Sequence, residues 1–452
     1  MSRWRWGRNS SSPTARSRND PRGVRRVKKI PASALILVLA AAASAGPGQP
    51  KTADPLERLA RLYEDSRYFE FRDAVARMED HPSPEMEFFR GAVDEVFNRL
   101  DSAVSRLRNY LSSAGKGPAR RMAKEAWVLL ADAFRRAGRY REAGEARREI
   151  LARFGPALSR EEKANCENQA GLWSALADIP PQQVEVGEDT TIRMTNRQFP
   201  VRVKDRTFFV GYDTGANLSV LYKSIADELG VAIYGPAIKI QSGTGQRIDG
   251  RTGVVPEMRL GSIIIRNAIF LVLPDELFPS AVARFGVDRR GLLGAPILEG
   301  FREITETKDG DLIIPASPRP RPEQNMCFSG FMPIVQVLYR GACLSLSLDT
   351  GSSATHLYPP FFRRYRGEIA SRSTLRKSTM GSVGSSVTVP IHVLDEFGFR
   401  AGGMDLSLRK IAVHTEVTHA DTRYFHGTLG LDILTQCSRM TLNFESMSFI
   451  LE

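Results

Sequence analysis

Phe208-Phe-Val-Gly-Tyr-Asp-Thr-Gly-Ala216 and Leu344-Ser-Leu-Ser-Leu-Asp-Thr-Gly-Ser352 are two copies of one motif, and they lie 136 residues apart. Each copy is followed by a short apolar segment bounded by glycines, Gly291-Leu-Leu-Gly294 or Gly427-Thr-Leu-Gly430, which are also 136 residues apart. About one chain in ten of this length would contain a single Asp-Thr-Gly by chance at average residue usage. Two copies with the same spacing to a second motif indicate an internal duplication.

The sequence around these motifs is typical of short β-strands. From Pro180-Pro181 onward, runs rich in Val, Ile, Phe and Thr alternate with Gly, Asp and Pro. A Pro-rich stretch beginning at Pro315 divides this region into two comparable halves. We therefore expect one all-β lobe over residues 188–315, a linker over 316–325 and a second all-β lobe over 326–452.

Residues 54–178 are helical in character, with apolar side chains at spacings of three and four. Part of this region resembles the tetratricopeptide pattern, in which each repeat is a pair of antiparallel helices. The residues that carry this resemblance are Trp127, Leu130, Ala131, Phe134, Gly138, Tyr140 and Ala143. Degenerate copies near Leu56 and Phe88 would extend the array, and a generic helical bundle is the alternative. The expected fold class is multidomain α + β, with a helical repeat region that offers a surface to a protein partner.

The first 45 residues resemble a secretion signal. A basic stretch ends at Lys28-Lys29, an apolar run spans residues 34–43, and Ala43-Ser44-Ala45 supplies the small residues that a signal peptidase needs. The run is shorter than the roughly 20 residues of a membrane-spanning helix. We expect export to the periplasm or the extracellular space without a stable membrane anchor, and a disordered basic tail is the alternative.

Most of the formal net charge of +12 lies in the same stretch, because residues 1–45 hold ten basic side chains and one acidic side chain. The remaining chain carries only about +3, which is too little to indicate a nucleic-acid partner. A cluster of arginines at positions 135, 136, 139 and 141 is most simply a solvated helix surface.

The duplicated motif favours the chemistry of paired carboxylates. Asp213 and Asp349 each follow an apolar strand, and Gly215 and Gly351 allow the chain to turn tightly behind them. Two carboxylates held close together share one proton, because two like charges at that distance do not both ionise easily. The ionised member can deprotonate a water molecule while the protonated member polarises a carbonyl group.

The two motifs and the glycine-bounded segments resemble the aspartic peptidase superfamily over roughly residues 188–452. The resemblance implies two lobes related by a pseudo-twofold axis, each of which supplies one catalytic Asp. It also implies that the hydroxyl groups of Thr214 and Thr350 tie the two motif loops together. The first motif, which ends in Ala216, is closer to retropepsins, and the second, with Ser352, is closer to pepsin. Fusion of the lobes makes a monomer sufficient for the active site.

This resemblance implies an aspartic endopeptidase that hydrolyses a polypeptide substrate with an activated water, without a metal ion and without a cofactor. The alternative is a catalytically silent protein that keeps the protease fold and recognises partners through its helical repeats.

The fourth motif position differs between the copies. Ser352 has a hydroxyl group that could donate a hydrogen bond to Asp349, whereas Ala216 offers none to Asp213. A hydrogen bond to the charged form of a carboxyl group favours that form. We therefore expect Asp349 to be ionised and Asp213 to carry the shared proton, within a pair that titrates as a unit.

Two Gly- and Ser-rich segments are candidates for β-hairpin flaps over a bound substrate. The candidate residues of the first segment are Ser242, Gly243, Thr244 and Gly245, and those of the second are Met380, Gly381 and Ser382. Ordinary surface hairpins are the alternative. The four cysteines, at positions 166, 327, 343 and 437, are compatible either with disulfides or with buried thiols.

Overall fold

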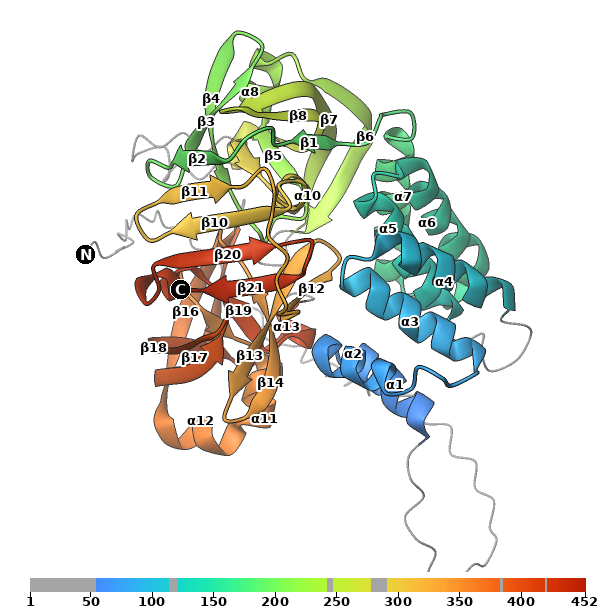
Figure 1. The fold of residues 1–452 in the computed structure, drawn as a ribbon, viewed down its shortest axis with the longest axis vertical. Coiled ribbons are helices and arrows are strands. Elements are labelled where there is room, and N and C mark those ends of the chain that lie inside the picture. The colour runs from blue at the N-terminus through green and yellow to red at the C-terminus, as the bar shows by residue number, and fades with distance from the viewer. Residues whose placement is uncertain (1–53, 114–120, 242–246, 278–290, 383–384, 419–420) are drawn as a thin grey trace, which may run out of the picture. The chain divides into compact units, whose positions relative to one another are not determined.

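The structure is a computed structural model that describes residues 54–113, 121–241, 247–277, 291–382, 385–418 and 421–452. The predicted order, a helical region followed by a β-rich region, is confirmed. Figure 1 shows helices α1 to α7 stacked beside the β-rich part. The predicted signal segment 1–45 and the candidate residues 242–245 lie outside the described residues.

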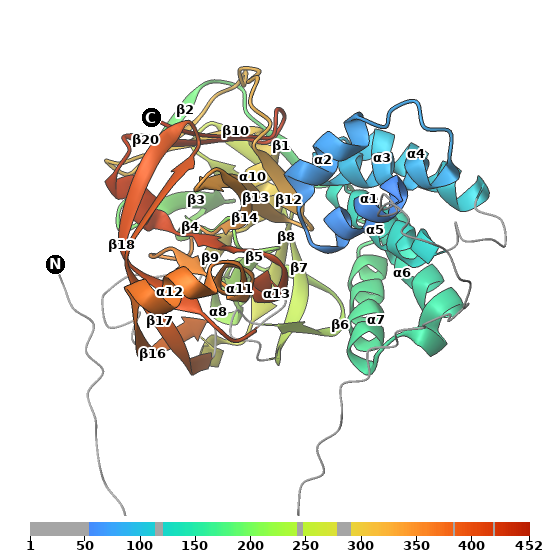
Figure 2. The same cartoon turned by 90° about the horizontal axis from the view of Figure 1, so that it is seen from below.

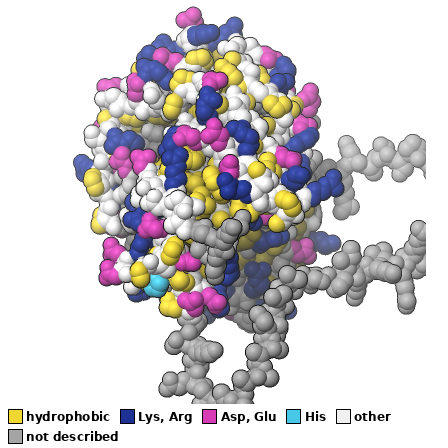
Figure 3. All heavy atoms as spheres, turned by 90° about the vertical axis from the view of Figure 1, so that its right-hand side faces the viewer, with side chains coloured by type: hydrophobic (Ala, Val, Ile, Leu, Met, Phe, Trp, Pro, Cys, Tyr) yellow, Lys and Arg dark blue, Asp and Glu magenta, His cyan; other side chains and the backbone are white. Residues whose placement is uncertain are grey.

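In residues 54–113 and 121–178, the N-terminal region contains seven α-helices. They are α1 (Pro55–Glu64), α2 (Tyr68–Ala76), α3 (Pro84–Val96), α4 (Leu100–Ser113), α5 (Ala123–Arg136), α6 (Tyr140–Phe154) and α7 (Arg160–Ala175). Helix α7 begins with a capping box, in which Ser159 accepts from the Glu162 amide and the Glu162 carboxylate accepts from the Ser159 amide. In the helical face shown in Figure 3, acidic and basic side chains are interspersed.

The turns that join α1 to α2, α3 to α4 and α5 to α6 have the same backbone form. Each contains one residue with positive φ, namely Ser66 (54°), Asn98 (62°) or Gly138 (70°). In each turn the next residue, an arginine, donates its N–H to the carbonyl five residues earlier, as in a Schellman motif. The described helices therefore include three helix pairs with one type of connection.

The first large sheet contains eight strands in the order β1-β8-β5-β9-β4-β3-β7-β6. Their bounds are β1 (Gln183–Glu185), β3 (Phe199–Val203), β4 (Arg206–Tyr212), β5 (Ser219–Tyr222), β6 (Ala232–Gln241), β7 (Arg247–Leu260), β8 (Ile263–Leu273) and β9 (Gly291–Leu293). An additional β7–β8 pairing closes six of these strands into a barrel. Strand β1 precedes residue 188 and pairs with β8, so this sheet begins earlier than the expected lobe boundary.

The second large sheet repeats the pairing of the six barrel strands and of the outer hairpin strand, but its remaining strand, β12, pairs with β13, whereas β1 pairs with β8. Its order is β12-β13-β14-β19-β15-β18-β17-β16, and an additional β13–β17 pairing closes the equivalent ring. Its strands are β12 (Met326–Ser329), β13 (Met332–Tyr339), β14 (Ala342–Leu348), β15 (His356–Leu357), β16 (Ser373–Ser382), β17 (Ser385–Ala401), β18 (Met404–His414) and β19 (Gly427–Leu429). The short α-helices of the described β-rich region are α8 (Lys223–Glu228) after β5, α10 (Ala295–Gly300) after β9, α11 (Pro359–Arg364) and α12 (Arg366–Arg372) after β15, and α13 (Asp421–Tyr424) before β19.

A five-stranded sheet joins the two halves, in the order β2-β11-β10-β20-β21 (Figure 1). Its strands are β2 (Thr190–Arg193), β10 (Glu303–Thr307), β11 (Asp311–Ile314), β20 (Arg439–Asn443) and β21 (Ser448–Leu451). At its centre Thr305 of β10 lies opposite Thr441 of β20, and their hydroxyl oxygens are 2.7 Å apart. These two residues are themselves 136 positions apart, so each half contributes the same residue to this contact.

All four cysteines are free thiols; three are buried and Cys343 is half-buried. Burial accounts for their placement because an unionised thiol packs as a small apolar group. Of the helices in the described part of the chain, none is both long and apolar enough to cross a membrane.

Candidate functional site

The two Asp-Thr-Gly motifs follow equivalent strands, and each is hydrogen-bonded to an equivalent parallel strand. Asp213 follows β4, and its N–H donates to the carbonyl of Leu293 in the parallel strand β9 at 3.0 Å. Asp349 follows β14, and its N–H donates to the carbonyl of Leu429 in β19, also at 3.0 Å. The glycine-bounded segments therefore fix the backbone from which each carboxylate projects.

The next glycine of each segment lies against the motif loop. A Cβ atom on Gly294 would lie 2.5 Å from the carbonyl carbon of Leu218, and one on Gly430 would lie 2.5 Å from that of Ala354. Neither position has room for a side chain, because the opposing atoms belong to the backbone. This close approach explains why both segments end in Gly, and it holds each segment directly against its motif loop.

The two motif loops are joined through their threonines, which are both buried. The Thr214 N–H donates to Thr350 Oγ1 at 3.0 Å, and the Thr350 N–H donates to Thr214 Oγ1 at 3.1 Å. The Thr214 hydroxyl also donates to the carbonyl of Leu348 at 2.7 Å. These reciprocal bonds bring the two loops together in one fixed arrangement.

The two carboxyl groups converge where the loops meet. A Cβ atom on Gly215 would lie 2.9 Å from Asp349 Oδ1, and one on Gly351 would lie 2.6 Å from Asp213 Cγ. Any side chain at either glycine would therefore displace the carboxyl group of the other motif. Both glycines have negative φ, so it is this approach, and not an unusual backbone conformation, that requires them.

The environment of Asp213 favours its protonated form. Burial and the charge of Asp349 raise the pKa of Asp213 to about 8, and a hydrogen bond between the two carboxyl groups adds to the shift. The N–H groups of Gly215 and Gly351 act in the opposite direction and lower this pKa. Asp213 therefore keeps its proton at neutral pH.

The hydrogen bond expected from the Ser352 hydroxyl to Asp349 is not formed. The hydroxyl donates to the carbonyl of Ala354 at 2.8 Å, because the loop turns back beside it. Asp349 Oδ1 instead accepts backbone N–H groups from Gly351 at 2.8 Å and Ser352 at 3.1 Å. The prediction that this side chain acts on the carboxylate is wrong; two backbone amides stabilise the charge.

The second candidate flap lies in the β16–β17 hairpin. Met380, Gly381 and Ser382 pair with Val387, Ser386 and Ser385, respectively. In the first half, strands β6 and β7 flank the candidate residues and also pair with each other. The structure therefore places the second candidate segment on a hairpin, whereas the residues of the first candidate segment lie outside the described part of the chain.

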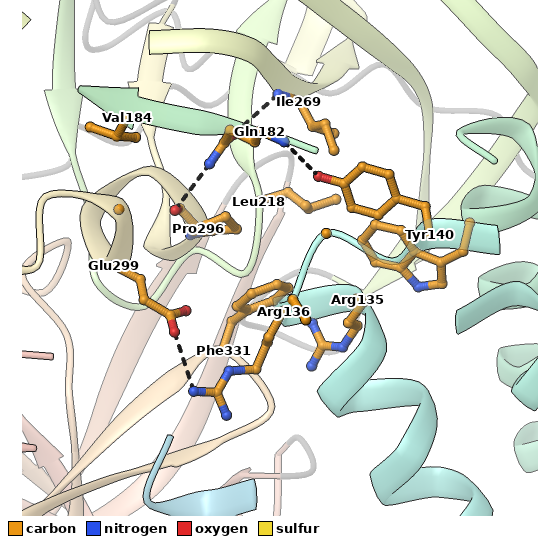
Figure 4. A pocket seen from close by; sticks show the side chains of 14 residues that line it. Arg135, Arg136, Tyr140, Gln182, Val184, Leu218, Ile269, Pro296, Glu299 and Phe331 are labelled. Atoms are coloured by element: carbon orange, nitrogen blue, oxygen red, sulfur yellow. Dashed lines mark hydrogen bonds and ion pairs between the residues drawn. The ribbon is translucent and has the colours of Figure 1, made fainter. Parts of the chain in front are cut away.

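Arg135 and Arg136, which were expected on a solvated helix surface, lie instead at the junction of the helices and the β-rich part. The Arg136 side chain is 0% exposed. It donates to the Glu95 carbonyl at 3.0 Å and to Asn98 Oδ1 at 2.6 Å. It also donates to Glu299 at 3.3 Å (Figure 4). Its guanidinium also lies 4.2 Å from the centre of the Phe328 ring. The helical periodicity alone did not distinguish this face, because its partners come from distant parts of the chain.

A cavity of about 220 Å³ lies at this junction. Figure 4 shows Gln182 bridging its wall. The side chain of Gln182 donates to the Pro296 carbonyl at 3.0 Å and accepts from the Ile269 N–H at 3.4 Å. Neither catalytic candidate lines the cavity, so it is separate from the carboxylate pair. Within the described residues, no cluster of His, Cys, Asp and Glu has the arrangement of a metal site.

Residues 199–297 match the protein family described as aspartyl protease. This segment includes the first motif and its glycine-bounded partner, and the match supports an aspartic peptidase. Among solved structures, a retropepsin-like aspartic protease from Rickettsia conorii is similar to the chain at 20% identity. That comparison covers 29% of this chain and 91% of the other, with a TM-score of 0.20. No curated protein matches the chain.

Proposed function

We propose that this protein is an aspartic endopeptidase whose catalytic residues are Asp213 and Asp349. The observation that carries the proposal is that each Asp carboxyl group lies against the motif glycine of the other half, so that the two carboxyl groups converge. The reciprocal threonine bonds support it because they hold the two groups in fixed positions. A preorganised pair of this kind is suited to catalysis because it needs little rearrangement when the substrate binds.

In the proposed mechanism Asp213 carries the shared proton and Asp349 is ionised. Asp349 accepts a proton from a water molecule between the carboxyl groups, while Asp213 donates a hydrogen bond to the scissile carbonyl. Attack of the water on the carbonyl carbon gives a tetrahedral intermediate. Transfer of a proton to the leaving nitrogen then breaks the peptide bond, and one proton remains on the pair.

The site requires both halves of the β-rich region, so we propose a bilobal enzyme with a complete site in one monomer. The matching pairings of the barrel strands and the Thr305–Thr441 contact support a pseudo-twofold relation between the halves. The three similar helix turns support a tetratricopeptide-like region that positions a protein partner. Export to the periplasm or the extracellular space is also part of the proposal, and it rests on the signal-like N-terminal sequence.

Cleavage of a mixed peptide pool from pH 3 to 9 tests this function. The parent protein should cut peptides, and Asp213→Asn and Asp349→Asn should each abolish the cuts. Asp405→Asn is the matched control, because Asp405 is an exposed carboxylate paired only with Arg400. Activity should fall above about pH 8, where Asp213 loses its proton. Cuts that persist in both dyad variants would overturn the proposal.

A further inference from the structure

Strands β6 and β16 occupy the same place in the two large sheets, because each lies at the end of its sheet and pairs with the long strand that follows it. The outer edges of the two strands differ in whether another element covers them. The edge of β6 is covered by helix α7: Asn168 Nδ2 donates to the Lys239 carbonyl at 2.8 Å, and the Lys239 N–H donates to Asn168 Oδ1 at 2.7 Å. One amide side chain thus makes the pair of bonds that a neighbouring strand would make.

A second contact closes the same edge. Gly235 of β6 has a φ of +66° and approaches α7 so closely that a Cβ there would lie 2.5 Å from the Ala175 Cβ. The first hairpin is therefore braced by the helical region along its outer strand.

The outer edge of β16 has no such cover. In the part of the chain that the structure describes, β16 pairs with β17 alone. It lies on the side of the β-rich part away from α1 to α7 in Figures 1 and 2. Leu375, in the first half of the strand, is 68% exposed. An open strand edge presents unpaired N–H and C=O groups that can pair with another extended chain.

This edge and the helices before it are strongly basic. Residues 361–379 hold six basic side chains and one acidic side chain, a net charge of +5. The whole chain has a formal net charge of +12, and residues 1–53, with eleven basic side chains and one acid, account for +10 of it. Residues 54–452 together therefore carry only +2, less than the +5 of residues 361–379 alone. The single acid, Glu368, is 14% exposed and already contacts Arg340, Arg372 and the Tyr339 hydroxyl. The positive charge of the edge is therefore not neutralised by its own segment.

The charges flank the place that an added strand would take. Leu375, Arg376 and Lys377 are consecutive exposed residues of β16. Successive side chains of a strand point to opposite faces, so Arg376 lies on one face and Lys377 on the other. An extended chain placed about 4.8 Å from β16 would have a basic side chain on each face and Leu375 beside it.

We propose that the open edge of β16 binds an extended, acidic polypeptide segment, which adds to the sheet as a further strand. A second copy paired edge to edge would bring Arg376 and Lys377 against their own copies, and like charges at that distance repel. The basic N-terminal stretch of the chain is unsuitable for the same reason. A nucleic acid would satisfy the charges but not the unpaired backbone groups or Leu375. The proposal concerns residues 373–379 of β16, which precede the candidate flap residues 380–382, and it does not require cleavage.

Binding is measured with the full chain carrying Asp213→Asn, so that the probe peptide is not cleaved during the measurement. The probe is a fluorescent peptide of about ten residues that alternates Glu with Val or Thr, and the readout is anisotropy. Arg376→Glu combined with Lys377→Glu should weaken binding about tenfold or more, because two attractive charges become repulsive. Arg202→Glu combined with Lys204→Glu is the matched control. It makes the same charge change on exposed residues at β3, whose two edges are paired with β4 and β7.

Hydrogen exchange and two further probes separate the mode of binding from simple charge attraction. The acidic peptide should slow exchange of backbone amides in residues 373–379, and a version N-methylated at alternate residues should not bind. Equal binding of the N-methylated peptide, or equal binding of a single-stranded oligonucleotide, would overturn strand addition and indicate a general polyanion surface. No binding of the acidic peptide would also overturn the proposal, and the charges would then only protect the edge from aggregation.

Discussion

At the scale of single residues, the fourth motif position shows how a side chain can be present without the role its chemistry permits. The Ser352 hydroxyl donates to Ala354, and backbone amides stabilise Asp349. Ser352→Ala should therefore leave the acid limb of the pH profile of kcat/KM where it is in the parent. An upward shift of that limb would show that the hydroxyl does reach the carboxylate during turnover.

Protonation of Asp213 links this residue to folding stability. Its folded-state pKa of about 8 lies above the ordinary value near 4, so the folded protein binds the proton more tightly than the unfolded chain. This contribution is fully present below about pH 4 and is lost as the pH rises through about 8. Asn mimics the protonated acid, so Asp213→Asn should increase in relative stability across that window. Melting temperatures of both proteins from pH 4 to 9 test this, and a constant difference would contradict it.

The sequence was sufficient to predict which residues form the carboxylate pair, since duplicated motifs with a common spacing identify equivalent positions. It also predicted the helical and β-rich regions, because local periodicity differs between them. It did not predict the direction of the Ser352 hydroxyl, which depends on how the loop returns to Ala354. The burial of Arg136 was also missed, because its partners lie in segments up to 192 residues away, at Phe328. Local patterns do not contain such contacts.

At the scale of elements, the repeated turns between helix pairs depend on a left-handed residue. Gly138 has a φ of +70°, and a Cβ there would lie 2.7 Å from Pro181 Cβ. Gly138→Ala should therefore lower the free energy of unfolding by about 1 to 3 kcal/mol. Gly171→Ala is the control, because Gly171 lies within α7 with nothing near its added Cβ. That change should stabilise the protein by about 0.5 to 1 kcal/mol. Urea unfolding measures both, and equal effects would contradict the account of the turn.

At the scale of the whole molecule, Arg136 joins the helical region to both halves of the β-rich region. Its partners include Glu299 in α10 and the ring of Phe328 in β12, and it also binds Glu95 in α3. The pKa of Glu95 is raised to about 7, because burial outweighs the opposing effect of the Arg136 charge. Removing the arginine would leave Glu95 and Glu299 without this partner in a buried setting. Arg136→Met should therefore cost about 3 to 5 kcal/mol of stability.

The same contact predicts how unfolding is coordinated across the chain. Of the four tryptophans, Trp127 and Trp173 lie in the helical region. With Trp4 and Trp6 replaced by Phe in every protein compared, the fluorescence reports on that region. Hydrogen exchange of peptides from β14 and β19, measured by mass spectrometry, can follow the β-rich part and supplies the β signal. In the parent protein the two signals should change together, because Arg136 and its partners couple the regions. In Arg136→Met the fluorescence transition should occur at a lower urea concentration than the β signal. Arg148→Met is the control, since the Arg148 side chain contacts only Ser174 of the same region. Separate transitions in the parent would show that the helical region folds independently, and the junction would then be a docking contact and not part of one cooperative unit.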